Sequence, residues 1–295
     1  MNIPEIQEIQ ANLNAELLSA AKCGKNEEVR RLLDRGAEID AVNAKGVTAL
    51  NAAAQEGHLA VVELLVERGA DVEKGAIYGQ TPLMTAAGCN RFDVVRFLLD
   101  NGANPEAKCH GFTALHLASN EGYNDIVELL LKRGANVHLV VNEIGNTALH
   151  MAARYGHVLV VCCLLNNGAK IDTKNADGLT ALHFASKNGF IDVVKLLLER
   201  DVDIDANDNS GSTALHLASK YGYIDVVRSL LNNGAKFDAK NNDGVTALYL
   251  AAQYANIDVV ELLLNRGAKI EDDVVEIIDD LYTGMMRGDP KYMSG

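Results

Sequence analysis

The sequence predicts an all-α solenoid, in which short helix-turn-helix units with hairpin fingers stack in a row. The first observation is a regular period, because threonine recurs at positions 48, 81, 113, 147, 180, 213 and 246, with spacings of 33, 32, 34, 33, 33 and 33 residues. The second is that an Ala-Leu or Pro-Leu pair follows each of these threonines. Although 295 residues would ordinarily suggest one or two globular domains, this period indicates one elongated repeat domain.

The stretch from Gly211 to Gly244 shows how one unit is built. Thr213 is of the residue type that caps a helix N-terminus, so a short first helix is expected to begin there and to end at Gly222. A second helix, with apolar residues at helical spacing, follows and ends at Gly234. The remaining residues are rich in Asn and Asp, which predicts a hairpin finger.

The N-terminal residues 1–14 carry apolar side chains at spacings of three and four after Pro4, which predicts a short amphipathic helix that covers the first repeat. Residues 15–46 follow the repeat pattern, except that Ala15 stands where threonine should be, and their polar residues suit an N-terminal capping repeat. Seven full units fill residues 47–271. Residues 272–295 are expected to form a C-terminal capping helix and a poorly ordered tail that begins at Gly284.

Three junctions lack the usual glycine. Asn90 and Ala255 replace the glycine between the two helices of a unit, and Asp201 replaces the glycine that ends a second helix. Because Asn enters the left-handed region readily, we expect strain only at Ala255 and Asp201. Two changes of unit length are visible. Gly102 and Gly111 are nine residues apart instead of ten, and Gly134 and Gly145 are eleven residues apart. Both changes are therefore expected in fingers, which are surface loops.

These features together resemble the ankyrin repeat. The Thr-x-Leu-His motif, the glycine between the helices and the Leu-Leu-x-x-Gly-Ala ending recur in register from Ala15 to about Glu271. The resemblance implies a non-enzymatic chain that binds proteins along a concave face of fingers and first helices. It also implies that the motif histidines at positions 116, 150, 183 and 216 tie adjacent repeats together by hydrogen bonds. A metal row is the alternative for these histidines, but metal ligands must converge on one point.

Composition excludes several classes of partner and of activity. A formal net charge of -13 argues against nucleic acids and anionic membranes as partners, since both attract dense positive charge. The five cysteines are odd in number and lack metal-ligand spacing, which favours reduced thiols in a cytoplasmic location. Cys109 and His110 would need a further metal ligand that is not evident. No signal peptide, membrane span, catalytic triad or phosphate loop is recognisable, so we expect no cofactor and no enzyme activity.

A binding site is expected where the repeats differ. The two residues before the inter-helix glycine are neutral or acidic in the first three full units but basic and aromatic in the last four. Because equivalent residues of stacked repeats lie side by side, we expect these to form one contiguous column. Tyr and Arg are favoured at interface hot spots. The predicted site consists of Arg154, Lys187, Lys220, Tyr155, Tyr221 and Tyr254. The alternatives are a chance cluster, or occupation of the column by the chain's own acidic residues 271–280.

A second candidate site lies in the fingers, where apolar residues replace the usual Asp, Asn and Lys. They are Ile77, Tyr78, Phe112, Leu139, Val140, Val141 and Ile144. The alternative is packing of each finger against its neighbour, but seven apolar residues together are more typical of an exposed partner site.

The sequence is therefore interpreted as a monomeric scaffold or adaptor that binds a protein partner, one with an acidic or amphipathic segment. Two other interpretations remain open. One is an effector of an intracellular bacterium or parasite that acts on a host protein in the host cytosol. The other is a substrate adaptor for an enzyme supplied in trans.

Overall fold

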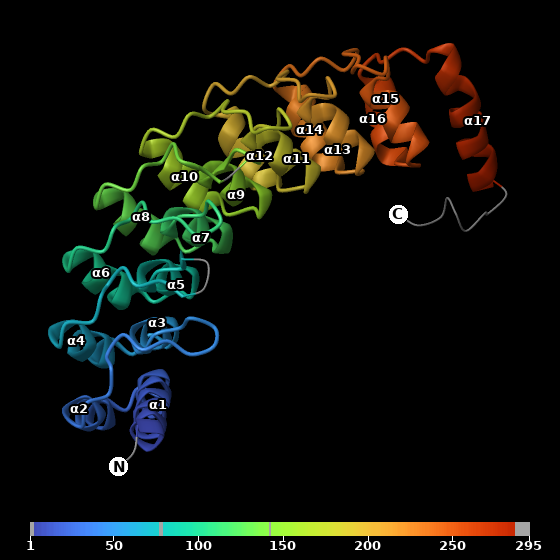
Figure 1. The fold of residues 1–295 in the computed structure, drawn as a ribbon. Coiled ribbons are helices and arrows are strands. Elements are labelled where there is room, and N and C mark those ends of the chain that lie inside the picture. The colour runs from blue at the N-terminus through green and yellow to red at the C-terminus, as the bar shows by residue number, and fades with distance from the viewer. Residues whose placement is uncertain (1–2, 77–78, 142, 287–295) are drawn as a thin grey trace. The chain divides into compact units, whose positions relative to one another are not determined.

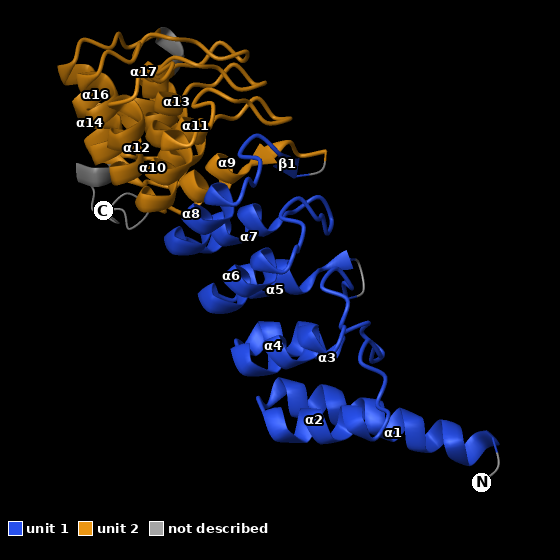
Figure 2. Cartoon of the chain, turned by 90° about the vertical axis from the view of Figure 1, so that its left-hand side faces the viewer, with its two compact units in different colours: residues 1–142 blue, residues 143–295 orange. Residues whose placement is uncertain are grey.

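The computed structural model describes residues 3–76, 79–141 and 143–286, and nearly all its regular elements are helices (Figure 1). Figure 2 colours two compact units, residues 1–142 and residues 143–295. The described elements of the first unit are α1 (Ile3–Lys22), α2 (Asn26–Asp34), α3 (Ala49–Glu56), α4 (Leu59–Glu67), α5 (Pro82–Gly88), α6 (Phe92–Asp100), α7 (Ala114–Glu121), α8 (Asn124–Lys132) and β1 (Val140–Val141).

The second unit repeats the same helical hairpin. Its described elements are β2 (Asn146–Thr147), α9 (Ala148–Arg154), α10 (Val158–Asn166), α11 (Ala181–Lys187), α12 (Ile191–Leu198), α13 (Ala214–Lys220), α14 (Ile224–Asn232), α15 (Ala247–Gln253), α16 (Ile257–Asn265) and α17 (Asp272–Met286).

Within each unit the helices stack in two rows. In the second unit α9, α11, α13 and α15 pack one against the next, and α10, α12, α14 and α16 form the other row (Figure 1). The core between the rows is made of Leu, Val and Ala side chains, such as Leu164, Val194 and Ala218, which are wholly buried. Each hairpin buries its apolar face against its neighbours, which is how a solenoid is stabilised. The predicted all-α solenoid is confirmed.

The seven periodic threonines are the N-cap residues of α3, α5, α7, α9, α11, α13 and α15, as predicted. In α3 the backbone N–H of Asn51 donates to the Thr48 hydroxyl at 3.1 Å. This bond satisfies a backbone donor that has no partner inside the helix. The period in the sequence is therefore a period of helix starts.

The N-terminal helix differs from the prediction. The helix that begins at Ile3 does not end at residue 14, because α1 continues through Ala15 to Lys22 without a Gly or Pro to stop it. The isoleucines expected to cover the first repeat are exposed, with exposed fractions of 74%, 53% and 46% for Ile3, Ile6 and Ile9. Of the predicted apolar residues only Leu13 is buried, at 7% exposure. Polar side chains add to its contact, since Gln10 donates to the Gly36 carbonyl and Asn14 accepts from the N–H of Glu38.

The C-terminal helix packs as a cap on the last first-row helix. Val274, Ile278 and Leu281 are buried, and α17 contacts α15, while Glu276 and Asp279 face solvent. The helix extends past Gly284, where the periodicity predicted its end, and reaches Met286. The rest of the tail that was predicted to begin at Gly284, residues 287–295, lies outside the described residues.

The fingers are hairpin turns in which an Asn or Asp side chain organises the backbone. In residues 175–179 the Asn175 side-chain oxygen accepts from the N–H groups of Asp177 and Leu179. The shortened finger replaces this turn with a two-residue turn, in which His110 and Gly111 have φ values of 49° and 83° between paired Cys109 and Phe112. Positive φ at both central residues is the type I′ hairpin geometry. The predicted loss of one residue in this finger is confirmed.

Neighbouring fingers of the second unit are joined by asparagines. The backbone N–H and the side-chain amide of Asn242 donate to the carbonyls of Ser210 and Asn209, at 2.9 and 3.0 Å. Asn209 repeats this pattern one finger earlier, where it donates to the carbonyls of Asp177 and Ala176. The fingers are therefore held in register by the chain's own amides.

The three junctions without glycine keep the left-handed backbone that glycine would adopt. The φ values are 58° at Asn90, 54° at Asp201 and 57° at Ala255. A left-handed conformation brings Cβ too close to the following carbonyl oxygen for most residues, whereas Asn and Asp tolerate it better. Ala255 is therefore the most strained of the three.

Substitution of Ala255→Gly should raise the unfolding free energy by about 1 kcal/mol, because glycine adopts this φ without the steric cost of a Cβ. Thermal or urea denaturation measures the change. Asn90→Gly is the matched control, and its gain should be smaller because Asn already tolerates the left-handed region. An Ala255→Gly variant no more stable than the parent would contradict the argument.

Candidate functional site

The four motif histidines are buried, and both nitrogens of each ring have hydrogen-bond partners. In the unit of α13, the Thr213 N–H donates to His216 Nδ1 at 3.1 Å, and His216 Nε2 reaches the Val245 carbonyl of the next repeat at 3.2 Å. Because Nδ1 accepts, Nε2 carries the proton that is donated to that carbonyl. His150 and His183 repeat this pattern, since their Nε2 atoms reach the carbonyls of Leu179 and Ser212 in the next repeat. His116 Nδ1 accepts from the Thr113 N–H in the same way, but its Nε2 reaches the Leu139 carbonyl in the finger of its own repeat. Burial lowers the pKa of all four histidines, and that of His116 falls to about 4.

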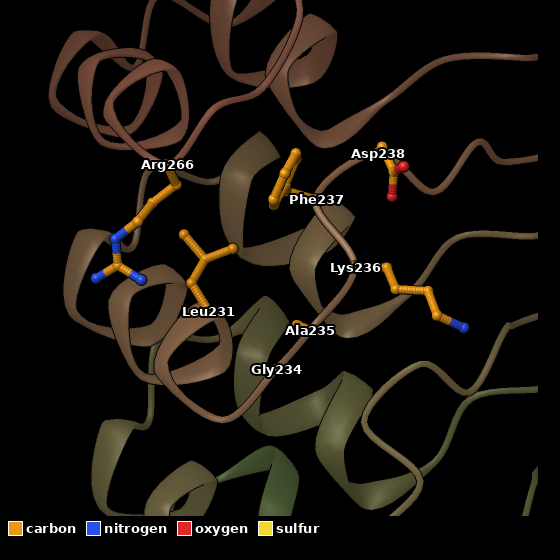
Figure 3. Close-up of a pocket in the computed structure, with 7 residues that line it drawn as sticks. All are labelled: Leu231, Gly234, Ala235, Lys236, Phe237, Asp238 and Arg266. Carbon is orange, nitrogen blue, oxygen red and sulfur yellow. The ribbon is translucent and has the colours of Figure 1, made fainter.

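Binding of a metal ion or of an anionic ligand requires side chains of the right kind to lie together. Among the residues described, no three His, Cys, Asp or Glu side chains gather as a metal-binding group. The hollow in Figure 3, of about 340 Å³, is bordered by Lys236 and Arg266, whose charged ends point in opposite directions. Arg266 is also engaged, since its Nη2 donates to the Asn232 side-chain oxygen at 2.7 Å. The hollow therefore offers no paired cations to an anionic ligand.

The predicted basic and aromatic residues lie at the C-terminal ends of consecutive first-row helices. Arg154, Lys187 and Lys220 are the last residues of α9, α11 and α13, which stack side by side (Figure 1). The C-cap residue follows each of them, and it is Tyr155 after α9 and Tyr221 after α13. We call Arg154, Lys187, Lys220, Tyr155, Tyr221 and Tyr254 the cation-aromatic column.

The aromatic rings of the column are open to solvent. Tyr155, Tyr221 and Tyr254 have exposed fractions of 46%, 45% and 50%. Tyrosine rings of this kind expose apolar area next to a hydroxyl that can form hydrogen bonds, a combination favoured at protein interfaces.

Each end of the column places a cation over two rings. The Arg154 guanidinium carbon lies 5.7 Å from the centroid of Tyr155 and 5.9 Å from that of Phe184, which comes from the next helix, α11. The Lys220 Nζ lies 5.9 Å from the Tyr221 ring and 5.1 Å from the Tyr254 ring. Cation-π attraction holds these long side chains above rings of two successive repeats.

Lys187 differs from its two neighbours. It is exposed, and among the described residues it has no ion pair and no cation-π contact. The position that holds tyrosine after Arg154 and Lys220 holds Asn188 here, whose amide donates to the Phe184 carbonyl at 2.8 Å. Of the three cations in the column, Lys187 is therefore the most available to an incoming carboxylate.

The apolar finger residues are less exposed than the second candidate site requires. Val141 is buried, and Phe112 and Leu139 are half-buried, because each finger packs against its own repeat. In the first unit the Leu139 carbonyl accepts from His116, and the Phe112 ring meets the His116 ring edge-on. Val140 and Ile144 remain exposed, at 42% and 51%, in the first and the second unit respectively. Ile77 and Tyr78 lie outside the described residues.

Sequence reasoning missed Phe184. It is 7% exposed and supplies one of the two rings near Arg154. The signal was present in the alignment of units, because Phe184 stands where the neighbouring units have Met151 and Leu217. A larger aromatic side chain at this position brings a ring under the cation of the preceding repeat.

A comparison with known families gives a clear result. The family model described as "Ankyrin repeats (3 copies)" matches residues 7–76, 71–141, 104–175, 138–208 and 201–273. Among curated proteins, no relative matches the chain significantly. No helix in the described part of the chain is both long and apolar enough to cross a membrane.

Proposed function

The chain belongs to the ankyrin-repeat family, and from this premise we propose that it is a non-enzymatic scaffold or adaptor that binds a protein partner through the cation-aromatic column. Ankyrin repeats generally mediate protein-protein interaction. The observation that carries the proposal is the arrangement of Arg154 and Lys220 over paired rings, with Lys187 exposed between them.

The column suits an acidic segment for two reasons. The three cations of the column attract carboxylates locally, although the chain as a whole is strongly acidic. The tyrosine rings add apolar area that is removed from water when a partner binds. The cation-π contacts also restrain the two flanking cations before a partner arrives, which lowers the entropy lost on binding. A cytosol-like compartment accords with the five free cysteines. We further propose that the chain acts as a monomer.

The double charge reversal Lys187→Glu and Lys220→Glu should weaken partner binding by about 1 to 3 kcal/mol and reduce its salt dependence. Affinity purification with the parent and the variant identifies the proteins whose recovery is lost, and calorimetry with the purified partner gives the change in affinity. Thermal unfolding of both chains checks that the fold is intact.

The matched control is the double variant Lys195→Glu and Arg228→Glu. These cations are exposed on the second-row helices α12 and α14, in the same two repeats, and the change in net charge is the same. The control should bind as the parent does. Equal recovery of partners by the Lys187→Glu and Lys220→Glu variant would exclude the column, and the exposed finger residue Val140 would then be tested.

A further inference from the structure

The spacing of the cations in the column restricts the conformation of a ligand that meets all of them. Arg154, Lys187 and Lys220 occupy the same position on α9, α11 and α13, so successive cations are one repeat apart. Packed helices lie about 8 to 10 Å apart, so the stacked helices carry one cation per about 8 to 10 Å, and this is the mean spacing expected between the carboxylates of a ligand. A ligand that meets all three cations must present its carboxylates on one face with this period.

A polyproline II helix has that period. It turns once in 3 residues with a rise of about 3.1 Å per residue, so that every third side chain lies on the same face about 9.3 Å further along. A β-strand rises about 3.3 Å per residue and alternates its faces, so same-face residues are about 6.6 or 13 Å apart, which misses the cations. An α-helix returns to one face after seven residues and about 10.5 Å, so it needs about 15 residues to meet three cations.

The rings favour the polyproline conformation over the α-helix. Proline-rich segments in this conformation bind to surfaces lined by aromatic side chains, and their fixed backbone loses little entropy on binding. In the column, exposed tyrosines stand beside the two flanking cations, and Asn188 replaces the ring beside Lys187. The surface therefore has rings at both ends for apolar residues and an open ammonium in the middle for a carboxylate.

We propose that the column binds an extended acidic segment in the polyproline II conformation, with a carboxylate at every third residue and prolines between the carboxylates. The central carboxylate pairs with Lys187, and those on either side meet Arg154 and Lys220, while the prolines lie on the rings of Tyr155 and Tyr221. This inference rests on the proposed function and adds the conformation and the register of the ligand.

The test uses fluorescently labelled peptides with the full-length protein. The probe is Glu-Pro-Pro-Glu-Pro-Pro-Glu, and the control of equal length, charge and composition is Glu-Pro-Glu-Pro-Pro-Pro-Glu, which breaks the period of three. We expect the probe to bind about tenfold more tightly than the control, as measured by fluorescence anisotropy, since the control can meet fewer cations at once. Lys187→Glu should remove this preference, whereas Lys195→Glu should leave it unchanged.

Three outcomes would overturn the inference. They are equal affinity for the two peptides, no binding of the probe, and tighter binding of a 15-residue Ala-Gln helix that carries Glu at positions one, eight and fifteen. None of them bears on the proposed function, which fails only if the Lys187→Glu and Lys220→Glu variant retains all the protein partners of the parent. The two failures are therefore distinguished by different experiments.

Discussion

Lowering the pH from 7 to 5 should reduce the unfolding free energy by about 2 kcal/mol through His116 alone, and by more through the four buried histidines together. The folded-state pKa of His116 is about 4, below its ordinary value of 6.5, so the unfolded chain binds more protons between these two pH values. The stabilisation is therefore complete above pH 6.5 and is lost as the pH falls towards 4. His150, His183 and His216 add to the loss in the same direction, because burial lowers the pKa of each.

The chain supplies its own control for this prediction. Asn51 occupies the position of the motif histidine in its unit, where its side-chain oxygen accepts from Thr48 and its amide reaches the Gln80 carbonyl at 3.4 Å. Asn cannot titrate, yet it forms the same capping box. Replacing all four histidines by Asn should flatten the urea-denaturation free energy between pH 7 and 5. A variant that keeps the slope of the parent would assign the pH dependence to other groups.

Gly211→Ala should lower the unfolding free energy by about 2 to 4 kcal/mol. Gly211 has a φ of 76°, which disfavours any residue with a Cβ. An added Cβ would also lie 2.8 Å from the backbone nitrogen of Asn242 and 2.5 Å from its side-chain oxygen, so the next finger would have to move. That movement would break the hydrogen bonds that join the two fingers.

Gly244→Ala separates the two contributions. Gly244 has the equivalent turn position and a similar φ of 78°, but a Cβ there would meet nothing within 4 Å. Its loss should be about 1 to 2 kcal/mol, from the backbone conformation alone. Thermal or urea denaturation of the two variants gives the difference. If both substitutions were equally destabilising, contact between fingers would contribute nothing measurable.

The fold was predictable from the sequence because each repeat contains residues that mark where its helices begin and end. Thr213, Gly222 and Gly234 act through local backbone preferences, and the repetition confirms each assignment several times over. The N-terminal boundary was not predictable in the same way. No residue between Leu13 and Leu17 stops a helix. The hydrogen bonds of the Gln10 and Asn14 side chains are made with Gly36 and Glu38, which are distant in the sequence, so local preferences do not predict them.

The position of the candidate site was predictable from the sequence, but most of the side-chain contacts within it were not. Equivalent positions of stacked repeats must lie near one another, so the alignment of units brought Arg154, Lys187 and Lys220 together. The pairing of each flanking cation with two rings depends on rotamers and on Phe184, which the period does not reveal. Val141 was expected to be exposed but is buried. Successive side chains of a strand point to opposite faces, and one face of this hairpin is buried.

The asparagine links between fingers also bear on how such a chain changes length in evolution. Gly178 meets Asn209 as Gly211 meets Asn242, with the same donors and acceptors on each side. An unequal recombination that removed residues 179–211 would bring Gly178 against Asn242 and recreate a junction that the chain already contains. Duplication of the same segment would do likewise. The chain can therefore gain or lose one whole repeat in a single step without having to evolve a new contact between its fingers.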